Sequence, residues 1–427
     1  MSRRPRRLDL SAIAVDITPL RESPGYRALW VGQALSLMGT QMRQVAVPVQ
    51  VFRLTGSNAA VGLIGLVELV PLIIFSIIGG TIADRFDRRI VMAWSQIGLM
   101  ITSGALALVT FRGGATLAWI YGLTALSSAF ASVDRPTRSA VLPHLVAPNQ
   151  LSSAMALRQV LFQLTMIVGP LVAGVLIGVA NLGVIYTIDA ASFVAALVSV
   201  YWVPRLPVIV SEHTGWESVK EGLRYSFRTP IILAIFLTDL EAMIFGSPRA
   251  LYPALAKTVF HRESLVGVLY AAPAVGAMLA ALTTGWVERI ERHGLAVIVS
   301  VLVWGVAIFG VGVCTFSLAL TLLFLAIAGG ADVVSAVFRG TMLIENSPDQ
   351  LRGRTSAANL MVVTGGPRLG DLEGGLVAAA VGPAASITIG GAGCIVATLA
   401  IAARFKGYLG YKRSDARYRE ASAGRES

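Results

Sequence analysis

The second long apolar stretch of the chain ends in GTIADRFDRR, at positions 80–89. A similar polar turn, ERIERH, follows another long apolar stretch at positions 288–293. Positions 84–89 and 288–293 share one pattern, which is acid, arginine, apolar, acid, arginine, base. A dense cluster of charge between long apolar stretches is typical of a short loop between two membrane helices. Its return about 200 residues later indicates two related halves.

The composition shows that the bilayer is part of the solvent of this chain. Of its 427 residues, 55% are hydrophobic and 14% are charged, whereas about 25% are charged in a typical soluble domain. Stretches of about 20 apolar residues mark membrane helices. They predict twelve spans: 27–53, 57–83, 89–111, 116–138, 154–178, 182–203, 230–256, 264–287, 294–316, 318–342, 354–380 and 383–405. No span alternates apolar and polar residues, which disfavours a β-barrel.

We therefore predict an all-α polytopic membrane protein, with twelve transmembrane helices in two pseudo-symmetric six-helix bundles. The predicted segments are a basic cytoplasmic N-terminal tail (1–25), the first bundle (26–203), a cytoplasmic linker (204–229), the second bundle (230–405) and a basic cytoplasmic C-terminal tail (406–427). In the linker, Val219, Leu223 and Phe227 recur every four residues, as on one face of a helix. This spacing predicts a short amphipathic helix on the membrane surface.

The formal net charge of +11 is a topology signal. With the N-terminus in the cytoplasm, about 28 of the 35 lysines and arginines lie on the cytoplasmic side, in agreement with the positive-inside rule. An even number of spans then places both termini in the cytoplasm. The positive charge therefore does not indicate nucleic acid as a partner.

The sequence contains no pattern that indicates a cofactor or a metal site. Cys314 and Cys394 lie in apolar stretches without ligand spacing, and the four histidines are scattered. The sequence contains no P-loop, so nothing in it supports transport that is driven directly by ATP hydrolysis. The expected partners are a small-molecule substrate, protons and the lipid bilayer, and the expected state is a monomer.

Three further matches support the two halves. Residues 148–151 correspond to 348–351, Gly169 and Gly174 correspond to Gly370 and Gly375, and Pro48 and Gly62 correspond to Pro253 and Gly267. A parallel repeat places two similar bundles side by side, with an interface about which a transporter can rock. A channel or a membrane enzyme could also be duplicated, but neither requires this arrangement.

These residues resemble the major facilitator superfamily over about residues 25–405. Positions 80–89 are similar to its loop motif between helices two and three, G-x-x-x-D-R-x-G-R-R/K, with Asp87 in place of a glycine. TMIVGPLVAG, at 165–174, resembles the fifth-helix motif of the superfamily's antiporters, G-x-x-x-G-P-x-x-G-G, with Thr165 and Ala173 in place of glycines. YRALWVGQ (26–33), LTGS (54–57) and PTRSAVLP (136–143) look like the enterobactin-exporter and macrolide-efflux branch. The resemblance implies alternating access, export and proton coupling, with helices three, six, nine and twelve against lipid.

The loop motif has a physical rationale as a conformational latch. Gly80 permits close helix approach, and the acids and arginines can pair with neighbouring elements. The predicted latch comprises Gly80, Asp84, Arg85, Asp87, Arg88 and Arg89, with Asp134 and Arg135 as partners and Glu288, Arg289, Glu291 and Arg292 as its repeat. The alternative is that these charges only set the topology. For Gly169, Pro170 and Gly174, a bend that seals the interface and ordinary helix packing both stay open.

Charged residues within spans are the candidates for transport and proton coupling. Each costs roughly 2.5–3.5 kcal/mol at the bilayer centre, so each should face the bundle interior or water. The candidates are Arg43, Glu68, Asp239, Glu241, Arg249, Asp332, Arg368, Asp371 and Glu373. Arg43 and Glu68 lie at nearly the same depth, which predicts a direct ion pair and makes Glu68 the first candidate proton carrier, before Glu241. Structural pairing that never titrates is the alternative for all of them.

Together these features predict an exporter of small amphipathic molecules of the drug, macrolide or siderophore class, driven by proton antiport across a bacterial inner (cytoplasmic) membrane. An importer or a uniporter of the same fold is the first alternative. From a different class, a lipid flippase or a membrane-embedded enzyme is the second. An enzyme would require a catalytic cluster such as Ser/His/Asp, and the sequence contains no such constellation.

The predicted topology is open to a direct test. Reporter fusions after residue 215 and at the C-terminus should both report the cytoplasm, because the repeat and the charge bias place both positions there. A fusion within the loop after Arg112 serves as the periplasmic control. A periplasmic signal after residue 215 or at the C-terminus would contradict the predicted number of spans.

Overall fold

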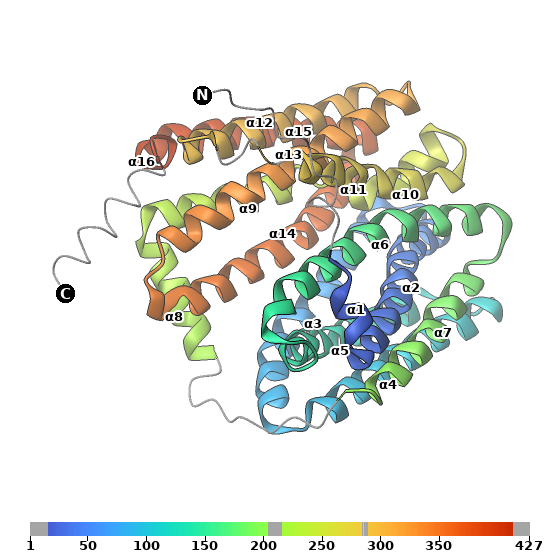
Figure 1. Ribbon diagram of the computed structural model, residues 1–427. Helices are drawn as coiled ribbons and strands as arrows, with labels where there is room; N and C mark the ends of the chain where they lie inside the picture. Colours follow the sequence, from blue (N-terminus) through green and yellow to red (C-terminus); the bar gives the residue numbers. More distant parts are fainter. Residues whose placement is uncertain (1–15, 204–215, 284, 286–288, 413–427) are drawn as a thin grey trace, which may run out of the picture.

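A computed structural model describes residues 16–203, 216–283, 285 and 289–412; the side chains of residue 77 and of residues 80–85 and 216–219 are not described. All regular structure in these residues is helical (Figure 1). The first half contains α1 (Thr18–Glu22), α2 (Pro24–Thr55), α3 (Asn58–Arg85), α4 (Arg88–Phe111), α5 (Leu117–Val141), η2 (Leu142–His144), η3 (Pro148–Gln150), α6 (Leu151–Val179) and α7 (Leu182–Val200).

After α8 (Trp216–Arg228), the second half repeats this order. It contains α9 (Pro230–Phe245), η4 (Arg249–Leu251), α10 (Tyr252–Ala254), η5 (Leu255–Val259), η6 (Glu263–Leu265), α11 (Val266–Leu282), α12 (His293–Val313), α13 (Leu318–Glu345), η8 (Asp349–Leu351), α14 (Arg352–Val381), α15 (Pro383–Arg404) and α16 (Lys406–Leu409). Each predicted span largely coincides with a long helix, and α8 lies within the predicted linker. The predicted all-α, twelve-span fold is confirmed.

Local sequence explains where the first long helix begins and ends. The Ser23 hydroxyl oxygen accepts a hydrogen bond from the Tyr26 backbone N–H, at 3.1 Å, and so caps the start of α2. The helix ends at Gly56, whose φ of 62° lies in the left-handed region that favours glycine. The next long helix, α3, starts two residues later, so this turn between two spans is very short.

The seventh span is broken, whereas the sequence predicted one continuous span from 230 to 256. The helix α9 ends at Phe245, and η4, α10 and η5 complete the crossing as far as Val259. Gly246 and Pro248 lie at the break, and Pro248 lacks the N–H that a continuous helix would use. Irregular backbone at membrane depth is tolerated where it lines a cavity, and Arg249 directly follows this break.

Hydropathy alone identifies nine of the spans. Within the described residues, nine helical segments are long and apolar enough to cross a membrane. The helices α2, α5 and α14 are also long enough, at 32, 25 and 30 residues, but they carry several charged residues. All three line the cavity between the halves, which explains why their sequences are less apolar.

The two halves pack with the same pattern, as the sequence repeat predicted. In the first half α2 packs on α6 and α7, α3 on α5, and α4 on α5 and α7. In the second half α9 packs on α14 and α15, α11 on α13, and α12 on α13 and α15. Between the halves, α3 packs on α14 and α6 packs on α11. These two interfaces are related by the repeat, so each bundle presents the same pair of helices to the other.

Pairs of glycines bring these helices together at the end remote from the termini. A Cβ on Gly62 would lie 3.0 Å from the Gly375 Cα, and a Cβ on Gly174 would lie 2.9 Å from the Gly267 Cα. Such small residues allow close approach of membrane helices. The sequence repeat relates Gly62 to Gly267 and Gly174 to Gly375, so one contact is the repeat image of the other.

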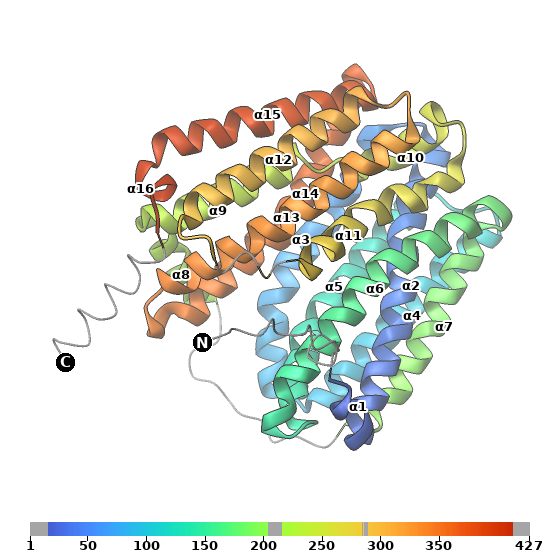
Figure 2. The same cartoon turned by 45° about the horizontal axis from the view of Figure 1, so that its top comes forward.

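The two bundles converge at this end and diverge toward the end that carries α1, α8 and α16 (Figure 2). At the converging end one apolar core includes residues of both halves, such as Val49 and Leu255. Toward the diverging end the described apolar clusters belong to a single half, as do those around Tyr26 and Tyr408. The structure is therefore closed on one side and separated on the side of the termini.

Four helices face away from the cavity, as the resemblance implied. The helices α4, α7, α12 and α15 contribute none of the residues that line the cavity. Large apolar side chains are exposed on them, including Trp94 on α4 and Val396 on α15, each 67% exposed. Exposed apolar side chains over long helices form a surface suited to lipid.

The glycine contact yields a prediction about stability. In Gly375→Val, the new Cβ would lie 2.7 Å from the Gly62 Cα, and overpacking of this kind costs about 1–3 kcal/mol. Thermal unfolding of the detergent-solubilised protein should therefore occur at a lower temperature than in the parent. Gly122→Val is the matched control, because a Cβ there has no atom within 4 Å. Equal unfolding temperatures for the two variants would contradict the close contact.

Candidate functional site

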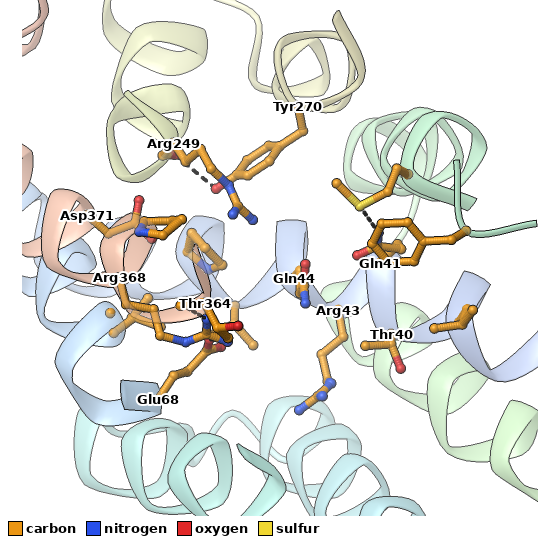
Figure 3. Close-up of a pocket in the computed structure, with 18 of the residues that line it drawn as sticks. Thr40, Gln41, Arg43, Gln44, Glu68, Arg249, Tyr270, Thr364, Arg368 and Asp371 are labelled. Carbon is orange, nitrogen blue, oxygen red and sulfur yellow. Dashed lines mark hydrogen bonds and ion pairs between the residues drawn. The ribbon is translucent and has the colours of Figure 1, made fainter. Parts of the chain in front are cut away.

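A cavity of about 620 Å³ lies between the two halves. The helices α2, α3, α5 and α6 line it from the first half, and η4, α11 and α14 line it from the second (Figure 3). Its walls combine apolar side chains, such as Leu37 and Phe162, with glutamines and charged groups. This size and mixture suit a small organic molecule.

Five of the nine predicted transport residues line this cavity, which are Arg43, Glu68, Arg249, Arg368 and Asp371. Asp239, Glu241, Asp332 and Glu373 do not belong to its lining. Two arginines that the sequence did not mark as transport candidates also line it. Arg135 was predicted as a latch partner, and Arg158 was not singled out.

Arg43 pairs with Asp189 of α7 rather than with Glu68, so the predicted Arg43–Glu68 ion pair is wrong. The Arg43 Nε lies 3.0 Å from an Asp189 oxygen, and the Asp189 side chain is fully buried. Arg43 Nη1 also donates to the Ser127 hydroxyl oxygen at 2.7 Å, and the Ser103 hydroxyl donates to Asp189 at 2.6 Å. The direction of the Arg43 side chain depends on the packing of α2 against α7, which depth along a helix does not predict.

Glu68 instead forms a bridge between the halves. Its carboxylate lies 3.2 Å from Arg368 Nη2, and these residues belong to α3 and α14. Arg368 Nη1 also donates to the Thr364 carbonyl at 2.7 Å. The pair lies beside the cavity (Figure 3), so a change in the charge of Glu68 would act directly on an interface between the bundles.

Arg249 and Tyr270 form the wall of the second half. The Arg249 guanidinium lies 5.9 Å from the centroid of the Tyr270 ring, and the Tyr270 hydroxyl donates to the Arg249 carbonyl at 3.0 Å. Figure 3 shows Arg249 and Tyr270 directed toward the open centre. Asp371 lines the same cavity, and its Oδ1 is buried without a hydrogen-bond partner.

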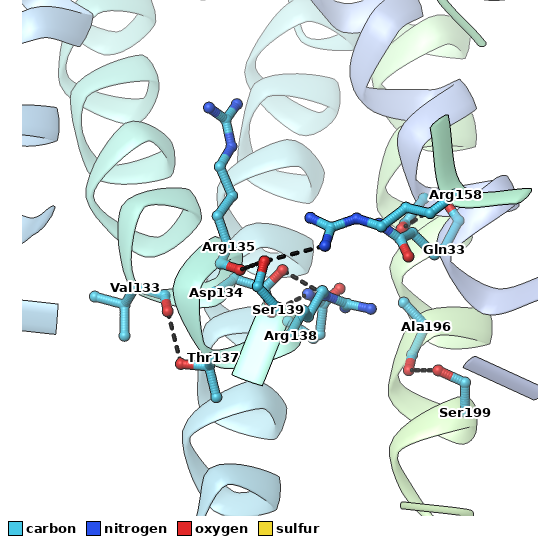
Figure 4. Close-up of polar contacts among 12 residues, drawn as sticks. Gln33, Val133, Asp134, Arg135, Thr137, Arg138, Ser139, Arg158, Ala196 and Ser199 are labelled. Carbon is cyan, nitrogen blue, oxygen red and sulfur yellow. Dashed lines mark hydrogen bonds and ion pairs between the residues drawn. The ribbon is translucent and has the colours of Figure 1, made fainter. Parts of the chain in front are cut away.

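A second polar cluster lies near the C-terminal end of α5 (Figure 4). Asp134 pairs with Arg138 at 2.6 Å and accepts from Gln96 of α4 at 2.8 Å. Figure 4 shows Arg135 directed away from this pair, and Arg158 reaching across to the Ser139 hydroxyl oxygen, at 3.1 Å. Asp134 is thus engaged within its own half, while Arg135 is directed into the cavity.

The charges of the second half mostly pair within their own bundle. Arg339 of α13 forms ion pairs with Asp239 and Asp332, and the Thr398 hydroxyl donates to Glu241 at 2.6 Å. The half-buried Glu373 has no ion pair within the described part of the chain. The sequence analysis did not single out Arg138 and Arg339 as site residues. They stand about 200 residues apart, and each is buried and paired with a buried aspartate, Asp134 and Asp239 respectively. The repeat could have identified this correspondence.

The latch residues are described only in part. Gly80, Asp84 and Arg85 lie in α3, but the side chains of residues 80–85 are not described, and Glu288 lies outside the described residues. Asp87 caps α4 by accepting from the Arg89 backbone N–H at 2.9 Å. Arg88 and Arg89 donate to the carbonyls of Ala140 and Tyr201, each at 3.2 Å. Arg289, Glu291 and Arg292 are exposed and form no ion pair with any described residue.

The fifth-helix residues pack against two different neighbours. A Cβ on Gly169 would lie 2.6 Å from the Gln41 Cβ on α2, so this glycine allows α6 to approach within its own half. Gly174 and the carbonyl of Pro170 lie against Gly267 of α11, across the interface. The motif therefore contributes to both packing within a half and the contact between the halves.

Comparisons with known proteins agree with this architecture. Residues 14–415 match the family model described as transmembrane secretion effector. An enterobactin exporter of Citrobacter koseri is 29% identical over 388 residues, which cover 90% of this chain and 92% of that protein. An enterobactin exporter of Escherichia coli O81 is 29% identical over 385 residues, with the same coverage.

Solved structures show the same fold at low sequence identity. A nucleoside transporter superposes with a TM-score of 0.72 and 16% identity, over 90% of this chain and 99% of that one. A bacterial homologue of the iron transporter ferroportin, in an inward-facing state, gives a TM-score of 0.70 and 16% identity, over 90% and 98% of the two chains. At such identities the likeness concerns the fold alone.

The buried pair of Arg43 and Asp189 yields a prediction. Asp189→Asn leaves a buried arginine without a counter-charge, and breaking a buried ion pair in this way costs about 3–5 kcal/mol. The thermal unfolding temperature of the purified protein should fall markedly. The double variant Arg43→Met/Asp189→Leu removes both charges and should recover most of this loss. If Asp189→Asn unfolds at the parent temperature, the pair does not stabilise the first half.

Proposed function

The chain belongs to the transmembrane secretion effector family and is a multi-pass transporter of the major facilitator superfamily, and from this premise we propose that it exports small amphipathic organic molecules by proton antiport. Siderophores are the favoured class of cargo, because relatives aligned over 90% of this chain are named enterobactin exporters. Drugs and macrolides stay as further candidates of the same kind.

The observation that carries the proposal is a polar cavity between two bundles that are joined at one end only. Glycine contacts and a shared apolar core close the end remote from the termini. At that end Arg53 also pairs with Glu263 at 2.6 Å, between the first and second halves. A cargo could enter from the side of the termini, and rocking of the bundles would then open the opposite side.

The direction of export follows from the proposed orientation. With both termini in the cytoplasm, as the positive-inside rule favours, the separated side of the cavity faces the cytoplasm. In the sequence, the predicted latch at positions 84–89 stands between the second and third predicted spans, and its repeat at 288–292 stands between the eighth and ninth, so this orientation assigns both to the cytoplasmic side. We assign them the role of holding the bundles together there when the cavity opens outward.

Proton coupling is assigned first to Glu68. Its partner Arg368 belongs to the other half, so protonation of the carboxylate would remove a charge pair that connects the bundles. Glu241 stays the second candidate, but its hydrogen bond joins α9 and α15 of one bundle. Asp371 also lines the cavity and can exchange protons with the water that enters it.

The proposal is tested by transport into inverted membrane vesicles from cells that produce the full chain. Enterobactin and erythromycin serve as the probes, and each is measured with and without an imposed pH gradient. We expect gradient-driven accumulation of at least one probe, with enterobactin favoured. Uptake that is independent of the gradient and only equilibrates the probe across the membrane would indicate a uniporter, and no uptake of either probe would contradict export of these classes.

Glu68→Gln tests the coupling step in the same vesicles. The variant can neither release a proton nor carry a charge at this position. Gradient-driven accumulation should therefore be lost, while exchange of labelled for unlabelled probe across the membrane continues. Asp349→Asn is the matched control, since its side chain is 81% exposed and outside the cavity. Full gradient-driven accumulation in Glu68→Gln would remove Glu68 from the mechanism and direct attention to Glu241 and Asp371.

A further inference from the structure

Arginines outnumber carboxylates in the cavity wall. Glu68 and Asp371 are the acids among its described lining residues. The arginines are Arg43, Arg135, Arg158, Arg249 and Arg368. A guanidinium group stays protonated in proteins, so this positive charge is permanent. The positive charge of the wall is therefore in excess whichever side of the membrane the cavity opens to.

Two of the five arginines are neutralised by near carboxylates. Arg43 pairs with the buried Asp189 behind the wall, and Arg368 pairs with Glu68. Among the described residues, Arg135, Arg158 and Arg249 have no carboxylate oxygen within 4.0 Å. Assigning the remaining acid, Asp371, to Arg249 still leaves two positive charges in excess.

The unpaired arginines come from both halves. Arg135 lies on α5 and Arg158 on α6, so they share the wall of the first half. The guanidinium of Arg135 makes no hydrogen bond to any described residue, and that of Arg158 donates to the Ser139 hydroxyl. Arg249 lies on the opposite wall, where the seventh span is broken, against the Tyr270 ring (Figure 3).

An unpaired charge at membrane depth is costly and is expected to serve a function. Water that enters the cavity solvates these arginines when it is empty, and a bound anion would replace that water with charge-assisted hydrogen bonds. The apolar part of the wall, with Leu37, Phe162 and Met166, would contact the body of the same molecule. Negative charge and apolar surface are thus both required of the ligand.

We propose that the cargo is an amphipathic organic anion, whose acidic oxygens bind between Arg135 and Arg158 on one wall and Arg249 on the other. This inference rests on the transport function proposed above and specifies its substrate class. A negative group shared by arginines of both halves would also reduce their mutual repulsion. The bound anion would therefore favour approach of the two walls, whereas a cation would oppose it.

Binding to the purified full-length protein in detergent tests the inference. The probes are fluorescein, an anion in neutral buffer, and rhodamine 123, a cation with the same ring system whose carboxyl group is blocked as a methyl ester. Fluorescence anisotropy gives the dissociation constant of each. We expect fluorescein to bind at least about tenfold more tightly than rhodamine 123, and its affinity to fall as salt concentration rises, because salt screens the attraction.

Variants identify the arginines. Arg135→Gln and Arg158→Gln should each weaken fluorescein binding by about tenfold, as loss of a charge-assisted hydrogen bond predicts. Arg135→Lys should keep much of the affinity, since it retains the charge. Arg112→Gln, an exposed arginine at the end of α4, removes the same charge outside the cavity and should bind like the parent.

Equal binding of both probes, tighter binding of rhodamine 123, or binding of neither would overturn the inference. So would parent-like fluorescein binding in Arg135→Gln and Arg158→Gln together. These outcomes leave the proposed export function standing if the vesicles still accumulate enterobactin or erythromycin. Loss of all transport together with intact anion binding would instead contradict the export function.

Discussion

A charged side chain within a bilayer must be paired or must face water, and this constraint organises the structure. Its cost of several kcal/mol explains why the intramembrane charges gather on helices other than the four outward ones, which expose apolar side chains instead. Asp189 is the informative exception, since it belongs to an outward helix, α7. Its side chain is fully buried and directed inward to Arg43, so lipid never meets the charge.

The repeat explains why the bundles meet as they do. Each half presents its second and fifth spans to the other, so the pair α3 and α14 is matched by the pair α6 and α11. Gly62, Gly174, Gly267 and Gly375 allow backbone to approach backbone in both pairs. A symmetric interface of small residues lets two similar bodies tilt about a common axis without separating large interlocked side chains. The same few glycines therefore connect the duplication with the rocking that we propose.

Hydropathy and the repeat were enough to predict the number of spans, the two halves and the helix in the linker. They were not enough to predict partners. Depth along a helix placed Arg43 and Glu68 at one height, but the rotation of each helix decides that Arg43 meets Asp189 and Glu68 meets Arg368. Rotation depends on packing between distant segments, which no local pattern contains. The break after Phe245 was also not predicted, although Gly246 and Pro248 are residues that often end a helix.

The contacts that close the cavity are also of the kind that can be undone. Arg53 and Glu263 remain about one third and one quarter exposed, at 34% and 23%, and exposed ion pairs are usually worth about 0–1 kcal/mol. Glu68 and Arg368 are partly exposed to the cavity, at 27% and 17%, so water can replace their mutual contact. By contrast, the pairs within a bundle, such as Arg138 with Asp134, are deeply buried and costly to break. The ion pairs between the bundles are thus weaker than those within each bundle, which is the distribution of free energy that rigid-body rocking would require of these pairs.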